Sequence, residues 1–164
     1  MGSVRSAIGR AGGALALVAA VALPGGLALA DGTERLDPTG DTAPAFTDIR
    51  KVSATHGKGG RLRHTIYLVD ADAASRSLAQ LTVRAHGKLY LIDARGVTTL
   101  STGSSARKVA RVRRRGNRIV FTFHRRLIGN PRRYRWLATV GSNDTSPGEF
   151  DRAPDRGMVL HHLR

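Results

Sequence analysis

The sequence predicts an all-β fold, an antiparallel β-sandwich of about seven to nine short strands that follows a cleaved signal peptide. Three observations support this prediction. Apolar residues recur at every second position and not at helical spacing. Turn residues, mostly glycine, interrupt this pattern about every eight to twelve positions. The chain beyond residue 30 is long enough for one domain with a core of its own.

The first thirty residues have the features of a secretory signal peptide. Arg5 and Arg10 give a basic start, residues 14–23 form an apolar run, and Pro24 ends that run. Small residues before the lead-in match a signal-peptidase site, so we expect cleavage after Ala30 and a secreted protein. A membrane anchor is the alternative, but this apolar run is too short to span a bilayer. We expect no transmembrane segment in the mature chain.

The rest of the chain predicts a lead-in followed by one domain. Residues 31–47 are rich in Gly, Pro, Asp and Thr and predict an extended acidic lead-in. Residues 48–164 predict a single β-sandwich domain with a polar C-terminal tail. Strands are expected, in chain order, at residues 48–55, 61–69, 81–85, 89–92, 97–102, 109–115, 118–123 and 134–141, with an edge strand at 158–160.

Short turns join these strands, and alternation assigns their faces. Residues 57–60 mark a turn, and Gly87-Lys88 predicts a two-residue hairpin turn. Gly116-Asn117 is the clearest hairpin signal, because both residues tolerate positive φ. The alternation puts Leu62, His64, Ile66 and Leu68 on one face of a strand and Arg63, Thr65, Tyr67 and Val69 on the other. In a second strand it puts Ile119, Phe121 and Phe123 on one face and Val120 and Thr122 on the other.

The charge is strongly positive and unevenly distributed. The chain holds 27 Lys and Arg against 12 Asp and Glu, a formal net charge of +15. No acid lies between Asp93 and Asp144, whereas 12 basic residues lie between Arg107 and Arg135. This segregation predicts a local positive field. The absence of Cys excludes disulfides as a source of stability.

The turn Asp37-Pro38-Thr39-Gly40-Asp41 carries two carboxylates. Hard cations such as Ca²⁺ take about six to eight oxygen ligands, often from loop carboxylates and carbonyls. Acids near the C-terminus would complete such a set if the two ends of the domain meet. We therefore expect a Ca²⁺ site made by Asp37, Asp41, Asp151 and Asp155. The alternative is a solvated turn in which Asp41 accepts hydrogen bonds from backbone amides.

The Arg-rich hairpin at residues 109–123 is a second candidate site. Guanidinium groups alternate along its first strand, and such groups pair with anions and release counterions from polyanions. We expect binding of wall polymers, anionic lipid headgroups, acidic polysaccharides or free nucleic acid, without sequence-specific nucleic-acid recognition because aromatics are few. The alternative is a solvated face that keeps an edge strand from aggregating. The candidate polyanion-binding residues are Arg111, Arg113, Arg114, Arg115 and Arg118.

Short motifs at both ends of the domain resemble a known family. The D-P-x-G-D pattern of residues 37–41 precedes Asp48-Ile49, and Pro154-Asp155-x-Gly157 follows a strand that contains Trp136. Over about residues 37–157 the chain resembles secreted domains of the DOMON and family 9 carbohydrate-binding-module type. The resemblance implies a jelly-roll-like sandwich, often with Ca²⁺ and sometimes with a sugar or haem site. Sugar binding would use the aromatics Trp136 and Tyr134, although alternation places several aromatics in the core. Haem is not expected, because Met158 is the only Met of the mature chain.

Catalytic patterns are weak. Ser105 and Lys108 match the S-x-x-K pattern of penicillin-recognising enzymes, but the chain is too short for that fold. The six His residues show no metal-binding spacing. We therefore expect no enzyme, but a secreted module that binds carbohydrate and carries a structural Ca²⁺. The alternative is a polyanion-binding protein associated with a wall or membrane surface.

Overall fold

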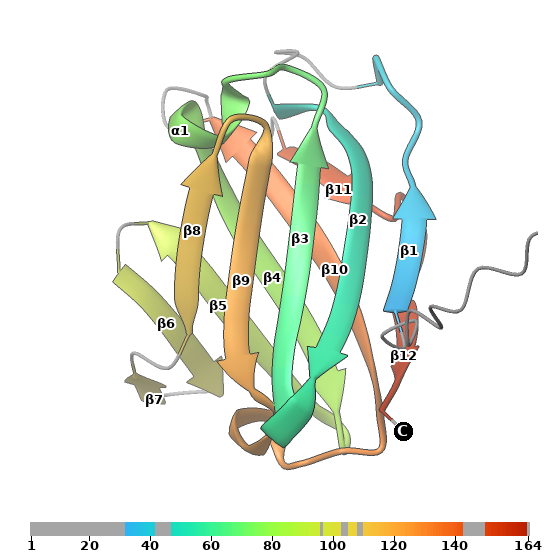
Figure 1. The fold of residues 1–164 in the computed structure, drawn as a ribbon, viewed down its shortest axis with the longest axis vertical. Coiled ribbons are helices and arrows are strands. Elements are labelled where there is room, and N and C mark those ends of the chain that lie inside the picture. The colour runs from blue at the N-terminus through green and yellow to red at the C-terminus, as the bar shows by residue number, and fades with distance from the viewer. Residues whose placement is uncertain are drawn as a thin grey trace, which may run out of the picture.

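The computed structural model describes residues 32–41, 47–95, 97–102, 105–107, 110–142 and 150–163. The predicted signal peptide and its cleavage site lie outside these residues. Within them, the strands form two antiparallel sheets that face each other (Figure 1). The predicted all-β sandwich is confirmed. The only α-helix in the described part of the chain is the single turn α1 (Ala73–Arg76).

Sheet A, in front in Figure 1, has five strands in the order β1-β2-β3-β9-β8. All neighbouring strands are antiparallel. Short connections join β2 to β3 and β8 to β9, whereas β3 and β9 are distant in sequence and pair only through the fold. The strands are β1 (Gly32–Leu36), β2 (Ile49–Gly57), β3 (Arg61–Leu68), β8 (Arg111–Arg115) and β9 (Arg118–His124).

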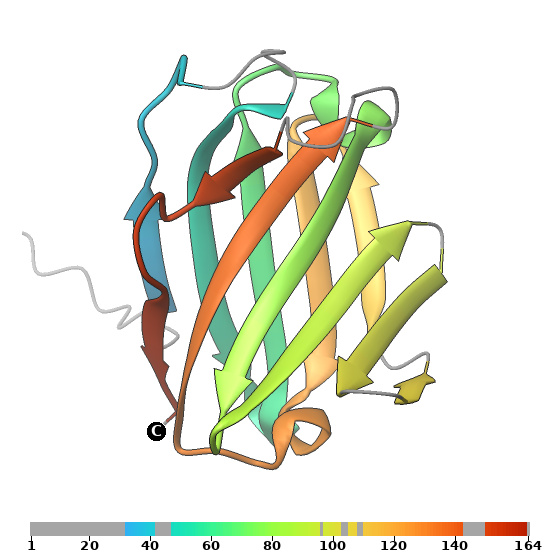
Figure 2. The same ribbon diagram turned by 180° about the vertical axis from the view of Figure 1, so that it is seen from behind.

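Sheet B lies behind sheet A and faces the viewer in Figure 2. Its strand order is β11-β10-β4-β5-β6-β7, and β12 also pairs with β10. The pairs are again antiparallel. The strands are β4 (Ser77–Ala85), β5 (Lys88–Arg95), β6 (Val97–Thr102), β7 (Ser105–Arg107), β10 (Arg133–Ser142), β11 (Phe150–Ala153) and β12 (Val159–His162).

The core lies between the two sheets, and strand alternation fills it. The predicted grouping by face holds in β3 and β9, and the faces that carry Leu62 and Phe121 are the buried ones. From sheet B, β10 contributes Tyr134 and Trp136, which pack around His64 of β3. Successive residues of a strand point to opposite faces of the sheet. The residues of β3 and β9 that alternate with the buried ones therefore lie on the outer face of sheet A. This places the polar side chains of these strands on one external surface.

The turn between β4 and β5 differs by one residue from the prediction. His86 and Gly87 occupy the turn, and Ala85 pairs with Lys88, so the predicted Gly87-Lys88 turn is wrong. His86 has φ 48° and Gly87 has φ 73°. A two-residue turn that follows the twist of its strands needs positive φ at both central positions. His86 therefore adopts the positive φ that this turn needs, and the residue type gave no sign of this.

The Gly116-Asn117 hairpin turn is confirmed. Arg115 pairs with Arg118 across it, and Gly116 has φ 56°. The Asn117 side-chain amide donates to the Leu68 carbonyl at 3.1 Å, and the Leu68 amide donates to the Asn117 carbonyl at 2.8 Å. These two bonds tie the β8–β9 hairpin to the end of β3.

Both acidic ends of the domain belong to the sheets. The lead-in contains β1, which pairs with β2, and the predicted polar tail contains β11 and β12, which pair with β10. Thr33 Oγ1 of β1 and His161 Nδ1 of β12 lie 2.6 Å apart. Figures 1 and 2 both show β1 beside β12 at one edge of the sandwich. The first and last parts of the domain therefore meet there.

Candidate functional site

The outer face of sheet A carries a groove whose floor is β9. Because β9 lies between β3 and β8, the strand register sets side chains of the three strands side by side. Arg63 pairs with Thr122, and Thr122 pairs with Arg111, so these three side chains form one row across the sheet. Arg61 and Arg113 lie one row to either side. Two strands of arginines thus flank a floor of short side chains.

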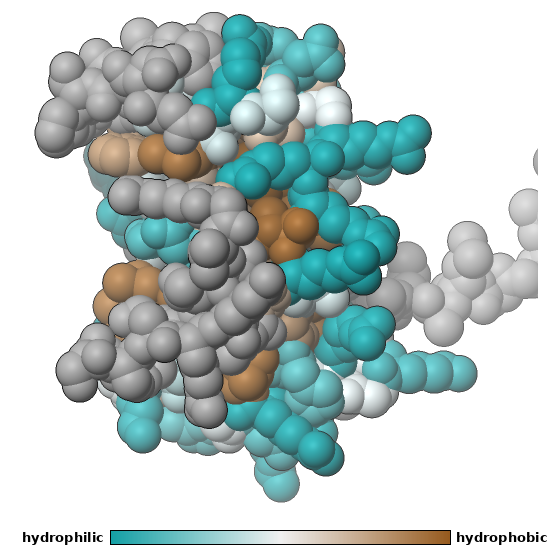
Figure 3. Space-filling model, turned by 90° about the vertical axis from the view of Figure 1, so that its left-hand side faces the viewer, coloured by the Kyte–Doolittle hydropathy of each residue, from teal (hydrophilic) through white to brown (hydrophobic). Residues whose placement is uncertain are grey.

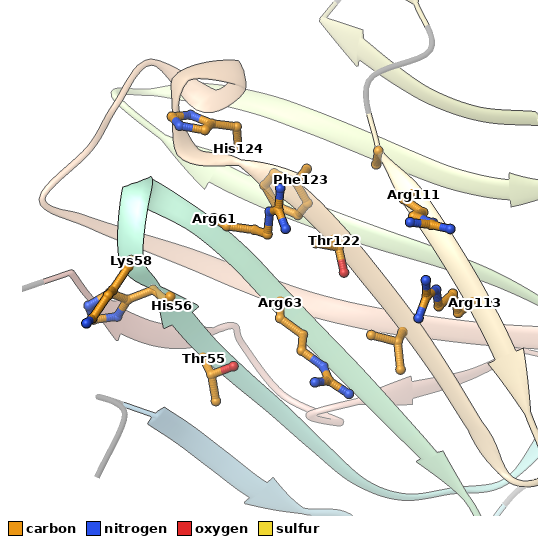
Figure 4. Close-up of a pocket in the computed structure, with 13 residues that line it drawn as sticks. Thr55, His56, Lys58, Arg61, Arg63, Arg111, Arg113, Thr122, Phe123 and His124 are labelled. Carbon is orange, nitrogen blue, oxygen red and sulfur yellow. The ribbon is translucent and has the colours of Figure 1, made fainter. Parts of the chain in front are cut away.

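The groove is open to solvent and has a volume of about 1020 Å³. Figure 4 shows Arg61, Arg63, Arg111 and Arg113 on the same side of their strands. A second hollow of about 600 Å³ shares His56, Gly57, Lys58 and His124 with the groove. This second hollow extends to Arg125 and Arg126 in the 3₁₀ turn η3 (Arg125–Ile128). The two hollows together form a continuous basic track.

Within the described ranges, the groove arginines form no salt bridge with an acid. All four are exposed. Among the described residues, the salt bridges join Lys51 to Glu34 and Arg76 to Asp70, and neither involves a groove arginine. Figure 3, a view onto the β8 edge, shows long hydrophilic side chains projecting on the sheet A side and apolar atoms between the sheets. The guanidinium groups are therefore available to an external anion.

The five predicted polyanion-binding arginines lie on both faces of sheet A. Arg111 and Arg113 line the groove, and Arg115 and Arg118 pair on the same face at the hairpin end. Arg114 differs from the prediction, because alternation turns it to the other side of β8. There its guanidinium donates to the Ala94 carbonyl of β5 and so links the two sheets.

Arg61 and Arg63 were not among the predicted polyanion-binding residues, although both line the groove. A signal was present, since the alternation of residues 61–69 already put Arg63 on the face opposite Leu62. What the pattern lacked was the pairing of β3 with β9, which brings these arginines opposite those of β8.

A second candidate site is a cluster of five aspartates where β1, β2 and β11 meet. Asp37 follows β1, Asp48 precedes β2, and Asp151 lies in β11. Carboxylate oxygens of Asp37, Asp151 and Asp155 lie within 4.8 Å of one another, as do those of Asp41, Asp48 and Asp151. The structure thus brings the four predicted ligands together and adds Asp48, while binding of an ion stays a prediction.

Backbone amides satisfy only part of this aspartate cluster. Asp48 Oδ2 accepts from the Gly40 amide at 2.6 Å, and Asp151 Oδ2 accepts from the Ile49 amide at 2.5 Å. Asp37 Oδ2 and Asp48 Oδ1 are buried and have no hydrogen-bond partner among the described residues. Asp37 is 8% exposed and Asp48 is 2% exposed. Burying an unpartnered carboxylate oxygen is unfavourable unless a proton or a cation compensates it.

Burial and mutual repulsion raise pKa values in the cluster. The pKa of Asp37 is raised to about 7, first by burial and then by the charges of Asp151, Asp155, Asp41 and Asp48. Burial also raises the pKa of Asp151, and two backbone hydrogen bonds partly oppose it. In the described part of the chain, no Lys or Arg forms a salt bridge with these five acids. A set of oxygen donors with excess negative charge fits Ca²⁺.

The predicted carbohydrate-binding aromatics are not at the surface. Trp136 is 0% exposed and Tyr134 is 2% exposed, because both point from β10 into the core. Tyr134 Oη lies 3.0 Å from His64 Nε2, and burial raises the pKa of Tyr134 well above its usual value. Neither ring offers a face on which a sugar can stack. Their assignment to carbohydrate binding is therefore wrong in this fold.

His64 is a core residue. It is 0% exposed, and its ring stacks on Phe123 with centroids 5.4 Å apart. The edge-on ring of Trp136 lies 4.7 Å away. Burial, together with the nearby charge of His161, lowers the pKa of His64 to about 3. The imidazole is therefore neutral at physiological pH.

Comparisons with protein-family models, with curated proteins and with solved structures found no match to this chain. The resemblance to DOMON and family 9 modules stays a prediction. None of the helices in the described ranges has the length and apolar character that crossing a bilayer requires. The groove and the aspartate cluster are therefore the basis for a functional proposal.

Proposed function

We propose that this protein is an exported, non-catalytic module that binds an anionic polymer in the groove on the outer face of sheet A. The observation that carries this proposal is the presence of arginines on both sides of β9, Arg61 and Arg63 on β3 and Arg111 and Arg113 on β8, with Arg63 and Arg111 in the same row. Arginine offers several donors in a rigid fork, which suits bidentate pairing with phosphate, sulfate or carboxylate. Each contact would also release a counterion from the polymer.

Protection of an edge strand explains only part of this arrangement. Charged residues on β8, the last strand of sheet A, would discourage pairing with another chain. Arg61 and Arg63 lie on β3, however, which has β2 and β9 on its two sides. A charge on a central strand protects no edge. Both arginines are exposed on the outer face, away from the core, so their effect on this face is to charge it.

Two variants of equal net charge test the proposal. The purified proteins are compared by the salt concentration needed for elution from immobilised heparin and by titration with polyphosphate. We expect the groove variant to elute at much lower salt than the wild type and the control variant to elute close to it. Equal retention of the two variants would refute the proposal. The groove variant is Arg63→Gln, Arg111→Gln and Arg113→Gln, and the control, on exposed positions of sheet B, is Arg84→Gln, Arg133→Gln and Arg135→Gln.

The aspartate cluster supports a second proposal, a structural Ca²⁺ that joins the edges of the two sheets. The supporting observation is the pair of buried, unpartnered oxygens, Asp37 Oδ2 and Asp48 Oδ1, within the cluster. The ion would connect the turn after β1 and the start of β2 with β11, so it would hold the first part of the domain against sheet B. Its role would be stability and not catalysis.

Calorimetry with Ca²⁺ and thermal unfolding with and without EDTA test this second proposal. Ligand at about a hundred times its Kd stabilises a folded protein by about 2.7 kcal/mol, which gives a readily measured rise in Tm. Asp48→Asn should abolish that rise, whereas Asp72→Asn, an exposed acid outside the cluster, should keep it. A Tm unaffected by Ca²⁺ and EDTA would contradict a structural ion.

A further inference from the structure

The geometry points to a particular class of polymer for this groove: a single, extended phosphodiester chain whose repeating unit carries no base, such as a poly(polyol phosphate). This inference rests on the proposed function and concerns the same site. It depends on three features of the outer face of sheet A, namely the spacing of its cations along the strands, the width between its arginine walls, and its shortage of aromatic surface.

The first feature is a ladder of cations along the strand direction. The register defines four rows of outward-facing residues, each two residues beyond the last. A strand rises about 3.4 Å per residue, so successive rows lie about 7 Å apart. Every row holds at least one guanidinium group. The rows contain Arg61 with His124, then Arg63 with Thr122 and Arg111, then Thr65 with Val120 and Arg113, and last Tyr67 with Arg118 and Arg115.

This spacing matches the charge repeat of an extended phosphodiester chain. In a poly(glycerol phosphate), as in a nucleic-acid strand, six single bonds of ordinary length separate successive phosphorus atoms. An extended run of six such bonds covers about 6–7 Å. A chain lying along β9 therefore presents one phosphate to each row. The first three rows line the groove, and the fourth continues the ladder on the same face.

The second feature is the width of the groove. Neighbouring strands lie about 4.8 Å apart, so the backbones of the two arginine-bearing strands are separated by about 10 Å. Between them β9 presents the short side chains of Thr122 and Val120, with His124 before them and Arg118 after them, and the Thr122 hydroxyl offers a further donor. Arg63 and Arg111 reach in from either side of this hydroxyl. A single chain fits between the walls, whereas a duplex is too wide to reach the floor.

The third feature separates a base-free chain from a nucleic-acid strand. Proteins that bind single strands usually stack bases on exposed aromatic rings. On the described outer face of sheet A the only phenyl or phenol ring is Tyr67, which is half-buried and has Lys51 Nζ 4.6 Å from its centroid. Phe123, at the groove end, is 3% exposed. The groove therefore offers phosphate contacts at each row, whereas the aromatic surface in its described lining is limited to the nearly buried Phe123 and the small imidazoles of His56 and His124.

Oligomers of poly(glycerol phosphate) with two, four, six and eight phosphates test the inference on the wild-type protein. We expect affinity to rise steeply up to about four phosphates, one for each row, and slowly beyond that. With about −0.7 per phosphate neutralised on a single strand, the slope of log K against log salt should be about −3. The groove variant defined above removes the cations of two of the four rows, so this slope should fall to about −1.4. The sheet B control variant should keep the wild-type slope.

Comparison probes distinguish the remaining outcomes. An abasic oligodeoxynucleotide should bind at least as well as oligo(dT) of equal phosphate number, and both should bind better than the matching duplex. Oligo(dT) binding tenfold more tightly than the abasic strand would show base recognition and overturn the inference. Equal affinity for oligogalacturonate of the same charge would also overturn it, but would leave anionic-polymer binding intact. If none of these polymers nor heparin binds, the proposed function itself fails.

Discussion

The buried His64 makes the stability of this domain sensitive to acid. Its ring is fully enclosed by Phe123, Trp136 and Tyr134, and the titratable groups that face it are Tyr134 and His161. Burial lowers its pKa from 6.5 to about 3. An unfolded chain therefore binds a proton at this His below pH 6.5, whereas the folded protein remains unprotonated until about pH 3. The stability contribution of neutral His64 is fully present above pH 6.5 and is lost progressively as the pH falls toward 3.

The size of this effect follows from the linkage relation. Each unit of pKa difference corresponds to about 1.4 kcal/mol, so His64 alone should lower the free energy of unfolding by about 2 kcal/mol between pH 7 and pH 5. The test is urea unfolding at the two pH values for the wild type and for a double variant, His64→Leu with Tyr134→Phe. The double variant replaces both partners of the buried hydrogen bond by apolar groups, which avoids leaving one of them unsatisfied.

The difference between the two proteins isolates the buried histidine. Other titrating groups, the aspartate cluster included, remain in both, so the double variant should lose about 2 kcal/mol less than the wild type over this pH range. His162→Gln, which removes an exposed His of β12, serves as the control and should behave like the wild type. If the double variant loses as much stability on acidification as the wild type, then His64 is not held neutral in the core and the reasoning fails.

Three further predictions concern the two sites and the β8–β9 hairpin. Asp37→Asn should raise the Tm measured in EDTA, because it removes a buried carboxylate crowded by like charges, and should reduce the gain from Ca²⁺; a lower Tm in EDTA would contradict this account. Arg114→Gln should change affinity for heparin by less than half as much as Arg113→Gln, since only Arg113 lines the groove, and elution salt concentrations decide between them. Gly116→Ala should cost roughly 1–2 kcal/mol in urea unfolding, because Gly116 has φ 56° and an added Cβ would lie 3.2 Å from the Ala71 carbonyl oxygen; an unchanged midpoint would show that the turn relaxes.

Local pattern was enough to predict most of the strands and their faces. Period-two alternation correctly grouped Leu62 with Ile66 on one face of β3, and Phe121 with its apolar neighbours on one face of β9, and these are the faces that the structure buries. The same pattern failed where the signal was weak. The acidic lead-in holds β1, which contains only Leu36 as a large apolar residue, and Leu36 is 76% exposed. A strand held mainly by backbone hydrogen bonds at a sheet edge leaves little trace in residue type.

The aromatic residues show where composition misleads. Tyr and Trp on a surface would suggest a sugar platform, but Trp136 and Tyr134 alternate into the core of β10. Alternation predicts that several aromatics lie inside, and in the structure both Trp136 and Tyr134 do. Their assignment to carbohydrate binding came from the family resemblance. Because both rings are buried, they cannot contact a sugar at the surface.

The sequence by itself determined the fold class, which residues of a strand share a face, and which segments are rich in basic or acidic residues. These features depend on local periodicity and on residue counts. Only the tertiary structure decided which charges act together. The pairing of β3 with β9 sets Arg63 opposite Arg111, and the meeting of β1 and β2 with β11 gathers Asp37, Asp48 and Asp151. Both juxtapositions join segments far apart in the chain, and they arise from burial of a shared core, which no local pattern specifies.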